Sequence, residues 1–159
     1  MLSLEERTHL MQKISALPKT LAGAVNELSE AQLQTRSIET EWTVAQIVHH
    51  IADSHMNSYI RTKLMLTEAH PALRPYDQEA WAKTPEITPT PLEASLTILR
   101  GLHQRWITLF ENMSDEDWQR TGHHPEIGDI TFDDILTIYA RHGEEHLEQI
   151  QRVLAAQAG

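Results

Sequence analysis

The 159-residue sequence contains no cysteine. This absence excludes disulfide bonds, thiolate metal ligands and a cysteine nucleophile. The sequence also lacks an apolar run long enough to cross a bilayer. Its first seven residues contain no basic segment followed by an apolar core, so we expect no signal peptide and a cytoplasmic location.

Basic residues are scarce relative to acidic residues, 13 against 23, and the formal net charge is -10 at pH 7. Non-specific binding of nucleic acid depends on Lys and Arg side chains at phosphates, and anionic membrane surfaces attract the same side chains. The charge therefore argues against both partners. Glycine is scarce as well: the six glycines are scattered, no phosphate-binding loop is present, and no G-x-S-x-G motif occurs.

The rest of the sequence has a helical pattern. Ser3 and Glu6 fit a capping box, the reciprocal pairing of side chain and backbone at a helix start. The residues that follow place apolar side chains at spacings of three and four, which indicates one buried helical stripe: Leu10, Ile14, Leu17, Leu21 and Val25. Pro18 falls within this stripe, so it either kinks the helix or begins a second segment.

Three more long helices are predicted from caps and apolar spacing. They begin at Thr43, at Thr90 with Pro91 as the first helical residue, and at Thr131 with Asp134. The first two extend to about Thr67 and Met113. Short helical turns are expected after Ser29 and Ser114, and residues 120–131 predict a small hairpin or an ordered loop. Four amphipathic helices can close a bundle around one core, so the predicted fold is all-α, with a single domain over residues 1–159.

A long connection over residues 69–91 contains five prolines. Long loops in compact domains are more often functional than idle. Trp81 lies in this connection, and we expect it to plug the bundle rather than to serve a function of the loop.

Histidine is the residue type that stands out, with ten copies spread along the chain. His142 and His146 are four residues apart in the last predicted helix, so they lie on one face about one turn apart. Two imidazoles in this arrangement can bind one metal ion, as in H-E-x-x-H sites. The alternative is a pair of partly buried histidines that are satisfied by hydrogen bonds.

Two ligands rarely hold a metal, and the best source of a third is His50. His50 lies three residues beyond Ile47, on or beside the core-facing stripe of its helix; His49, about 100° away, is the alternate ligand. Neutral imidazole suits zinc, nickel, copper and iron. Three protein ligands leave positions for water, which is typical of a catalytic site.

Other polar residues near this stripe each have two interpretations. His55 lies more than one turn beyond His50 and is either beside the ligands or solvated. Asp53 lies one turn below His50, where it could orient an imidazole or act as a general base. The remaining histidines are expected at the surface, at the edge of the core or in a plain turn: His9, His70, His103, His123 and His124.

Residues Trp42–Arg61, with the sequence WTVAQIVHHIADSHMNSYIR, resemble the signature of the YfiT branch of the DinB-like superfamily. Further motifs share the resemblance, which covers nearly the whole chain in order: Arg74-Pro75-Tyr76-Asp77 with Trp81, Gly101-Leu102-His103-Gln104-Arg105-Trp106, His124-Pro125-Glu126, and Tyr139-Ala140-Arg141-His142 with His146. Family members often carry more histidines in the last helix, where this chain has Glu144-Glu145 and Glu148-Gln149. Its substrate preference can therefore differ.

The resemblance implies a four-helix bundle with an up-down-down-up connection, often as a homodimer. It also implies one divalent metal ion per chain, nickel or zinc, on His50, His142 and His146. The implied function is hydrolysis of a small-molecule substrate by metal-activated water. Two alternatives stay open: transfer of a low-molecular-weight thiol such as bacillithiol, and metal binding without turnover. A role in binding damaged DNA, suggested by the superfamily name, is disfavoured by the net charge.

Overall fold

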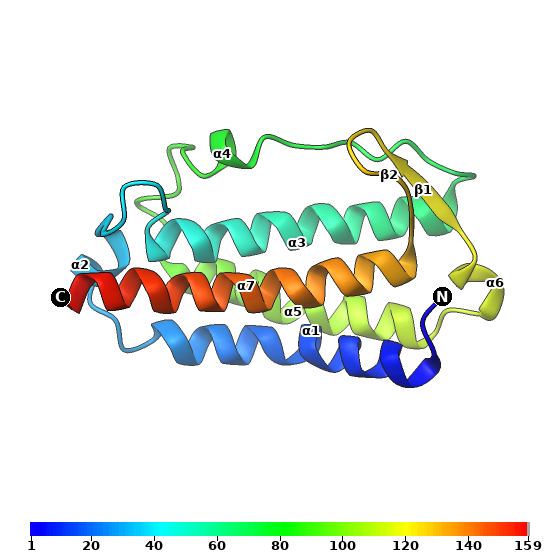
Figure 1. The fold of residues 1–159 in the computed structure, drawn as a ribbon, viewed down its shortest axis with the longest axis horizontal. Coiled ribbons are helices and arrows are strands. Elements are labelled where there is room, and N and C mark those ends of the chain that lie inside the picture. Colours follow the sequence, from blue (N-terminus) through cyan, green and yellow to red (C-terminus); the bar gives the residue numbers. More distant parts are fainter. Residues whose placement is uncertain (159) are drawn as a thin grey trace.

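The computed structural model describes residues 1–158 of the chain. Its long helices are α1 (Leu4–Val25), α3 (Val44–Thr67), α5 (Leu92–Glu111) and α7 (Phe132–Ala158), and they form a four-helix bundle (Figure 1). The connections contain the short helices α2 (Glu30–Gln34), α4 (Gln78–Trp81) and α6 (Asp115–Trp118), and the strands β1 (Thr121–His124) and β2 (Gly128–Thr131). Among the described helices, none combines the length and the apolar character that a membrane span requires.

The direction of the helices follows the predicted up-down-down-up order. In Figure 1, α1 and α7 run one way along the bundle, and α3 and α5 run the other way. Each of the helices α3 and α1 packs against both α5 and α7. Because α3 and α5 are parallel neighbours, the chain must return along the whole bundle between them, and the connection over residues 68–91 does so.

Most helix starts agree with the sequence signals. Capping boxes are present at Ser3 and Thr43, and Thr131 caps α7 by accepting a hydrogen bond from the Asp134 backbone N–H over 3.2 Å. The prediction for α5 was wrong by one residue. Pro91 is the N-cap rather than the first helical residue, with φ -59° and ψ 140°, and it makes no side-chain cap. Its fixed φ also suits extended backbone, so a proline is tolerated on either side of the helix start.

The predicted hairpin is confirmed as an antiparallel ribbon of β1 and β2. Thr121 faces Thr131 and His124 faces Gly128 in its register. The ribbon is tied to the segment that follows α3, because the His123 N–H donates to Pro71 O over 2.9 Å and the Leu73 N–H donates to His123 O over 2.7 Å. These bonds hold β1 against the start of the long connection.

Trp81 does not plug the bundle, which corrects the expectation. It is 40% exposed on α4 and packs against the Tyr76 ring, with the ring centroids 4.7 Å apart. A loop tryptophan is placed by its tertiary partners, which local sequence does not reveal. The buried tryptophans are instead Trp42, Trp106 and Trp118.

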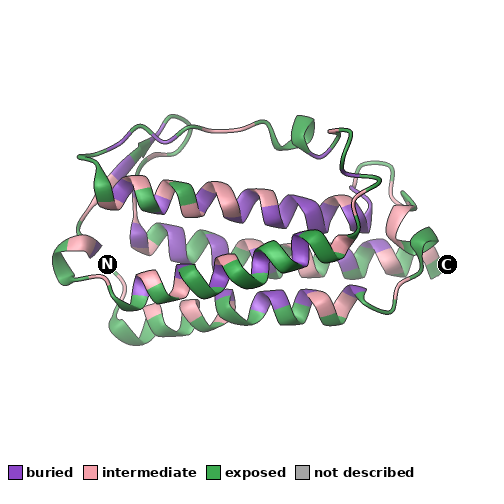
Figure 2. Ribbon diagram, turned by 180° about the vertical axis from the view of Figure 1, so that it is seen from behind, coloured by how far each residue is buried: buried purple, intermediate pink, exposed green. Residues whose placement is uncertain are grey.

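The apolar core is divided into two clusters along the bundle axis. One cluster contains Leu17, Ala52, Leu99 and Ile150, and the other contains Ile14, Met65, Trp106 and Ala140. On α3, α5 and α7, histidines lie between the two clusters: His55, His103 and His142. Buried residues concentrate on the inner faces of the long helices (Figure 2). The core therefore contains a polar layer at its middle.

Candidate metal centre

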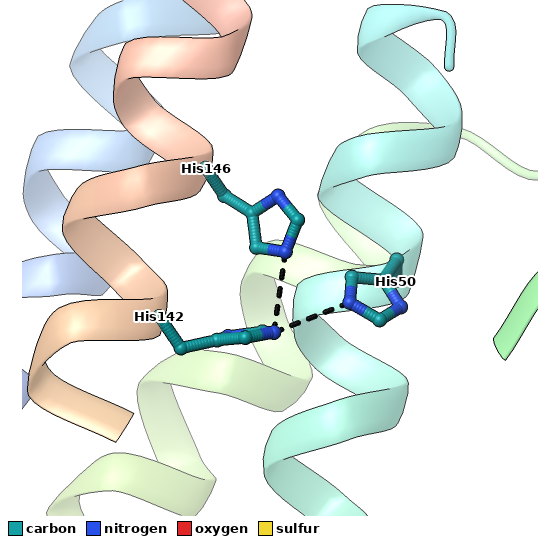
Figure 3. Close-up of side chains that lie close together, drawn as sticks. All are labelled: His50, His142 and His146. Atoms are coloured by element: carbon teal, nitrogen blue, oxygen red, sulfur yellow. Dashed lines mark hydrogen bonds between the residues drawn. The ribbon is translucent and has the colours of Figure 1, made fainter. Parts of the chain in front are cut away.

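Three imidazoles from two helices converge at one end of this polar layer. His142 Nε2 lies 3.2 Å from His50 Nε2 and 3.2 Å from His146 Nε2. Figure 3 shows the two α7 rings and the α3 ring turned toward one another. One nitrogen from each ring lies within 4.8 Å of the others. The structure thus brings together His50, His142 and His146, the three residues that we predicted as metal ligands.

The separations fit a divalent transition metal. Metal–nitrogen bonds of about 2.0–2.1 Å place neighbouring nitrogen ligands about 2.8–3.0 Å apart at octahedral angles and about 3.3–3.4 Å apart at tetrahedral angles. The two 3.2 Å separations from His142 Nε2 lie within about 0.2 Å of these values without any rearrangement of the helices. In the described chain the group contains three ligands and no fourth, so an ion held there would keep open coordination positions.

Burial makes the three imidazoles neutral lone-pair donors. Desolvation, with a smaller contribution from His146, lowers the pKa of His50 to about 3. Desolvation also lowers the pKa of His142 well below its ordinary value and lowers the pKa of His146. Neutral imidazole is the form that binds metals, so these rings do not have to lose a proton near pH 7.

Neighbouring side chains fix the rings of the site. The Trp42 ring centroid lies 4.6 Å from that of His50, and the Trp42 ring stacks on His146 at 6.3 Å with an interplanar angle of 13°. The Nδ1 atom of His146 lies 2.7 Å from Gln149 Oε1. A carbonyl oxygen only accepts, so Nδ1 of His146 carries the proton and its Nε2 carries a lone pair.

His55 and His103 extend the polar layer behind His142. His55 Nε2 lies 3.2 Å from His142 Nδ1, and His55 Nδ1 lies 2.8 Å from His103 Nε2. His55 is fully buried, so the alternative of a solvated side chain was wrong. The expectation that His103 lies at the surface or core edge was also wrong, since its exposed fraction is 2%.

Two cavities adjoin His142. One, of about 340 Å³, also borders Trp42, Glu79 and His146. The other, of about 450 Å³, borders Arg61, Tyr76 and Glu126 as well as His142. Arg61 therefore lies beside the site. Trp81 and Asn57 border neither cavity.

His49 and Asp53 do not join the three imidazoles. The His49 Nδ1 atom lies 2.7 Å from Ser95 Oγ on α5, so its ring points away from His50. In the described chain the Asp53 carboxylate makes no hydrogen bond to an imidazole. Burial, and secondarily the negative charge of Glu86, raises the pKa of Asp53 to about 6.

A second group of potential ligands, all exposed, is formed by His123 and Asp129 on the ribbon and by His70 in the segment that follows α3. One carboxylate oxygen, Asp129 Oδ1, lies 2.8 Å from His123 Nδ1 and 3.4 Å from His70 Nε2. Ordinary hydrogen bonding to the carboxylate accounts for this arrangement. Elsewhere, a groove of about 670 Å³ between α1 and α5 borders His103.

Comparisons with known proteins agree with the fold. The DinB superfamily matches residues 13–150. A protein of Oceanobacillus iheyensis and one of Bacillus cereus strain 03BB102, both named "Putative metal-dependent hydrolase", are each 43% identical over 140 residues. These matches cover 88% of this chain and 81% and 80% of the two relatives.

Solved structures extend the comparison. YfiT from Bacillus subtilis, described as a probable metal-dependent hydrolase with an unusual four-helix bundle topology, matches with a TM-score of 0.92 and 38% identity. The match covers 96% of this chain and 88% of YfiT. A mycothiol-dependent maleylpyruvate isomerase matches with a TM-score of 0.71 and 15% identity, over 92% of this chain and 60% of that one. At that identity the likeness concerns the fold alone.

Proposed function

This chain belongs to the DinB superfamily, and from that premise we propose that it is a metal-dependent hydrolase of a small-molecule substrate. The proposed centre holds one divalent metal ion, nickel or zinc, on His50, His142 and His146. The observation that carries the proposal is the convergence of three neutral imidazoles, with His142 Nε2 lying 3.2 Å from the Nε2 atom of each of the other two. Relatives named for metal-dependent hydrolysis support the reaction class.

A divalent ion with three imidazole ligands lowers the pKa of water and polarises a substrate oxygen. The chain itself supplies the binding groups. In the cavity of about 450 Å³, the Arg61 guanidinium is oriented by a hydrogen bond from one Nη to Arg74 O over 2.7 Å. Tyr76 and Glu126 add a hydroxyl and a carboxylate to the same cavity. These groups suit a small polar ester or amide placed beside His142.

Transfer of a low-molecular-weight thiol is the second candidate. It is favoured by the two separate cavities beside His142, which offer places for a thiol and for the electrophile that it attacks. The chain has no cysteine, so the sulfur nucleophile must come from solution. The homodimer, the cytoplasmic location and the single domain implied above stay predictions.

The proposal is tested by elemental analysis of the purified, untagged protein beside two matched variants. His50→Ala and His49→Ala each remove one buried imidazole from the same turn of α3. We expect about one nickel or zinc ion per chain in the wild type and in His49→Ala, and none in His50→Ala. Loss of metal from His49→Ala alone would instead assign the third ligand to His49.

Turnover is then measured on the metal-loaded protein with a panel of esters and amides, and with a cysteine-containing thiol plus an epoxide. Metal-dependent cleavage that is absent in His50→Ala supports hydrolysis. Metal-dependent consumption of the thiol supports the second candidate. A protein that takes up no nickel or zinc at all would remove both candidates.

A further inference from the structure

A continuous chain of hydrogen bonds leads from His142 to the backbone of α1. It passes from His142 Nδ1 to His55 Nε2 over 3.2 Å, and from His55 Nδ1 to His103 Nε2 over 2.8 Å. It ends where His103 Nδ1 meets the Ile14 carbonyl oxygen over 2.6 Å. Each imidazole uses both ring nitrogens, so the protonation of one ring constrains the next.

The carbonyl at the end of the chain fixes its direction. An oxygen of this kind only accepts, so His103 Nδ1 must carry the proton. His55 and His103 are 0% and 2% exposed, and their ring nitrogens meet only other imidazoles and a carbonyl, with no carboxylate to stabilise a cation, so both rings are neutral. His103 Nε2 is then an acceptor, and His55 Nδ1 must donate to it. By the same rule, His55 Nε2 accepts the proton of His142 Nδ1.

Pro18 explains why a helix carbonyl is available for this role. In an α-helix, the carbonyl of residue 14 accepts the N–H of residue 18. Proline has no N–H, so Pro18 leaves the Ile14 oxygen without its helical donor inside α1. A buried carbonyl without a partner is costly, and His103 Nδ1 satisfies it. The proline within the first helix and the histidine on α5 are therefore two parts of one arrangement.

We propose that His55 and His103 are positioning residues, which use the carbonyl left free by Pro18 to hold His142 as its Nδ1–H tautomer. In this tautomer the His142 Nε2 lone pair points at His50 and His146. In the opposite tautomer a proton would occupy the position needed by a metal. The inference deepens the proposed function, since it concerns one of the three proposed ligands, but the tautomer is a property of the metal-free chain.

The first test is spectroscopic and needs neither metal nor substrate. Two-bond ¹H–¹⁵N correlations on the metal-free protein, labelled with ¹⁵N-histidine, identify which ring nitrogen of each histidine is protonated. We expect His103, His55 and His142 all to be neutral Nδ1–H tautomers at pH 7. A predominant Nε2–H tautomer at His142 would overturn the proposal.

The second test compares two substitutions of nearly equal shape. His55→Gln retains an oxygen that can accept the His142 Nδ1 proton, whereas His55→Met offers no comparable acceptor. Groups that orient metal-binding histidines typically change metal affinity by about 10–100-fold when removed. We expect zinc affinity to fall by about that factor in His55→Met and by much less in His55→Gln. Equal affinity in the two variants would contradict the proposal.

The two tests separate this inference from the proposed function. If the wild-type protein binds no metal, the metal centre is refuted while the tautomer measurement still decides the hydrogen-bond chain. If the protein binds zinc and His142 is the Nε2–H tautomer, the chain is refuted while the metal centre stands. Should either variant fail to fold, as judged by circular dichroism, the tautomer of His142 in the wild-type protein alone decides whether the proposal holds.

Discussion

Gly143 on α7 and Leu17 on α1 lie in direct contact across the bundle. A Cβ atom at position 143 would lie 2.7 Å from Leu17 Cδ2. Leu17 is itself only 4% exposed, so its side chain has little room to move away. The absence of a side chain at residue 143 therefore lets α1 and α7 approach closely, one residue away from His142.

Gly143→Ala should destabilise the protein. Overpacking a core costs about 1–3 kcal/mol, and the gain in helix propensity offsets only about 1 kcal/mol of it. The matched control is Gly101→Ala on α5, where an added Cβ meets nothing within 4 Å. That change should raise the free energy of unfolding by about 0.5–1 kcal/mol. Urea unfolding measures the change in the free energy of unfolding, which should be negative for Gly143→Ala and positive for Gly101→Ala. A stabilised Gly143→Ala variant would show that Leu17 can repack.

His142→Ala should abolish stoichiometric metal binding while leaving a folded helical protein. His142 Nε2 is the atom closest to both other ligands, so its loss leaves a pair that rarely holds a metal. Elemental analysis measures the metal and circular dichroism measures the helices. Unchanged metal content in this variant would rule out the three-histidine centre.

Asp53→Asn should stabilise the protein at pH 7 more than at pH 4. Burial and Glu86 raise the pKa of Asp53 to about 6 in the folded state, against about 3.9 in the unfolded chain. The folded state therefore holds this proton more tightly. The stabilising contribution of the Asp53 carboxyl to the free energy of unfolding is fully present below pH 4. It is lost as the pH rises through 6. The groups that face Asp53 are Glu86 and Tyr76, both of which the variant retains.

Urea unfolding of the wild type and of Asp53→Asn at pH 4 and at pH 7 measures this linkage. The difference between the two proteins should grow in favour of the variant at the higher pH. An equal difference at both values would mean that Asp53 has an ordinary pKa in the folded protein.

Thr62→Val should lower the free energy of unfolding by about 1–3 kcal/mol, because it leaves the buried indole N–H of Trp106 without its acceptor. The Trp106 indole N–H donates to Thr62 Oγ1 over 3.1 Å, and both residues are fully buried. Thr108→Val on the exposed face of α5 is the control, with an expected change within about 0.5 kcal/mol. Chemical denaturation measures the change in unfolding free energy for each variant. Similar stabilities would show that the hydrogen bond of the Trp106 N–H contributes little to stability.

The three proposed ligands could be predicted because their signals are local. An i, i+4 spacing on a helix places His142 and His146 together whatever the rest of the fold does. His50 follows from its place on the apolar stripe of α3. The choice of His50 over His49 depends on how α3 is rotated against α7 and α5, which the sequence left open between two neighbours.

His103 was missed, although a signal for it was present. Leu96, Leu99, His103, Trp106 and Phe110 follow one another at spacings of three and four, and all are buried. A histidine at such a position is part of the core stripe. Its partner Ile14 is 89 residues away in the sequence, and no local pattern indicates that a proline in α1 frees a carbonyl for it. The role of Pro18 is visible only when the helices are packed.

The proposed ligands come from helices that lie far apart in the sequence, since 92 residues separate His50 from His142. An ion held between them would act as a reversible cross-link that closes a very long loop, with an entropic effect on the unfolded chain of the same kind as that of a disulfide. In a chain without cysteine, such an ion would be a cross-link that forms when the metal binds and breaks when it dissociates. A free metal concentration of 100 times the dissociation constant would add about 2.7 kcal/mol to the stability of the bundle. Scarcity of the metal would then lower the stability of the fold.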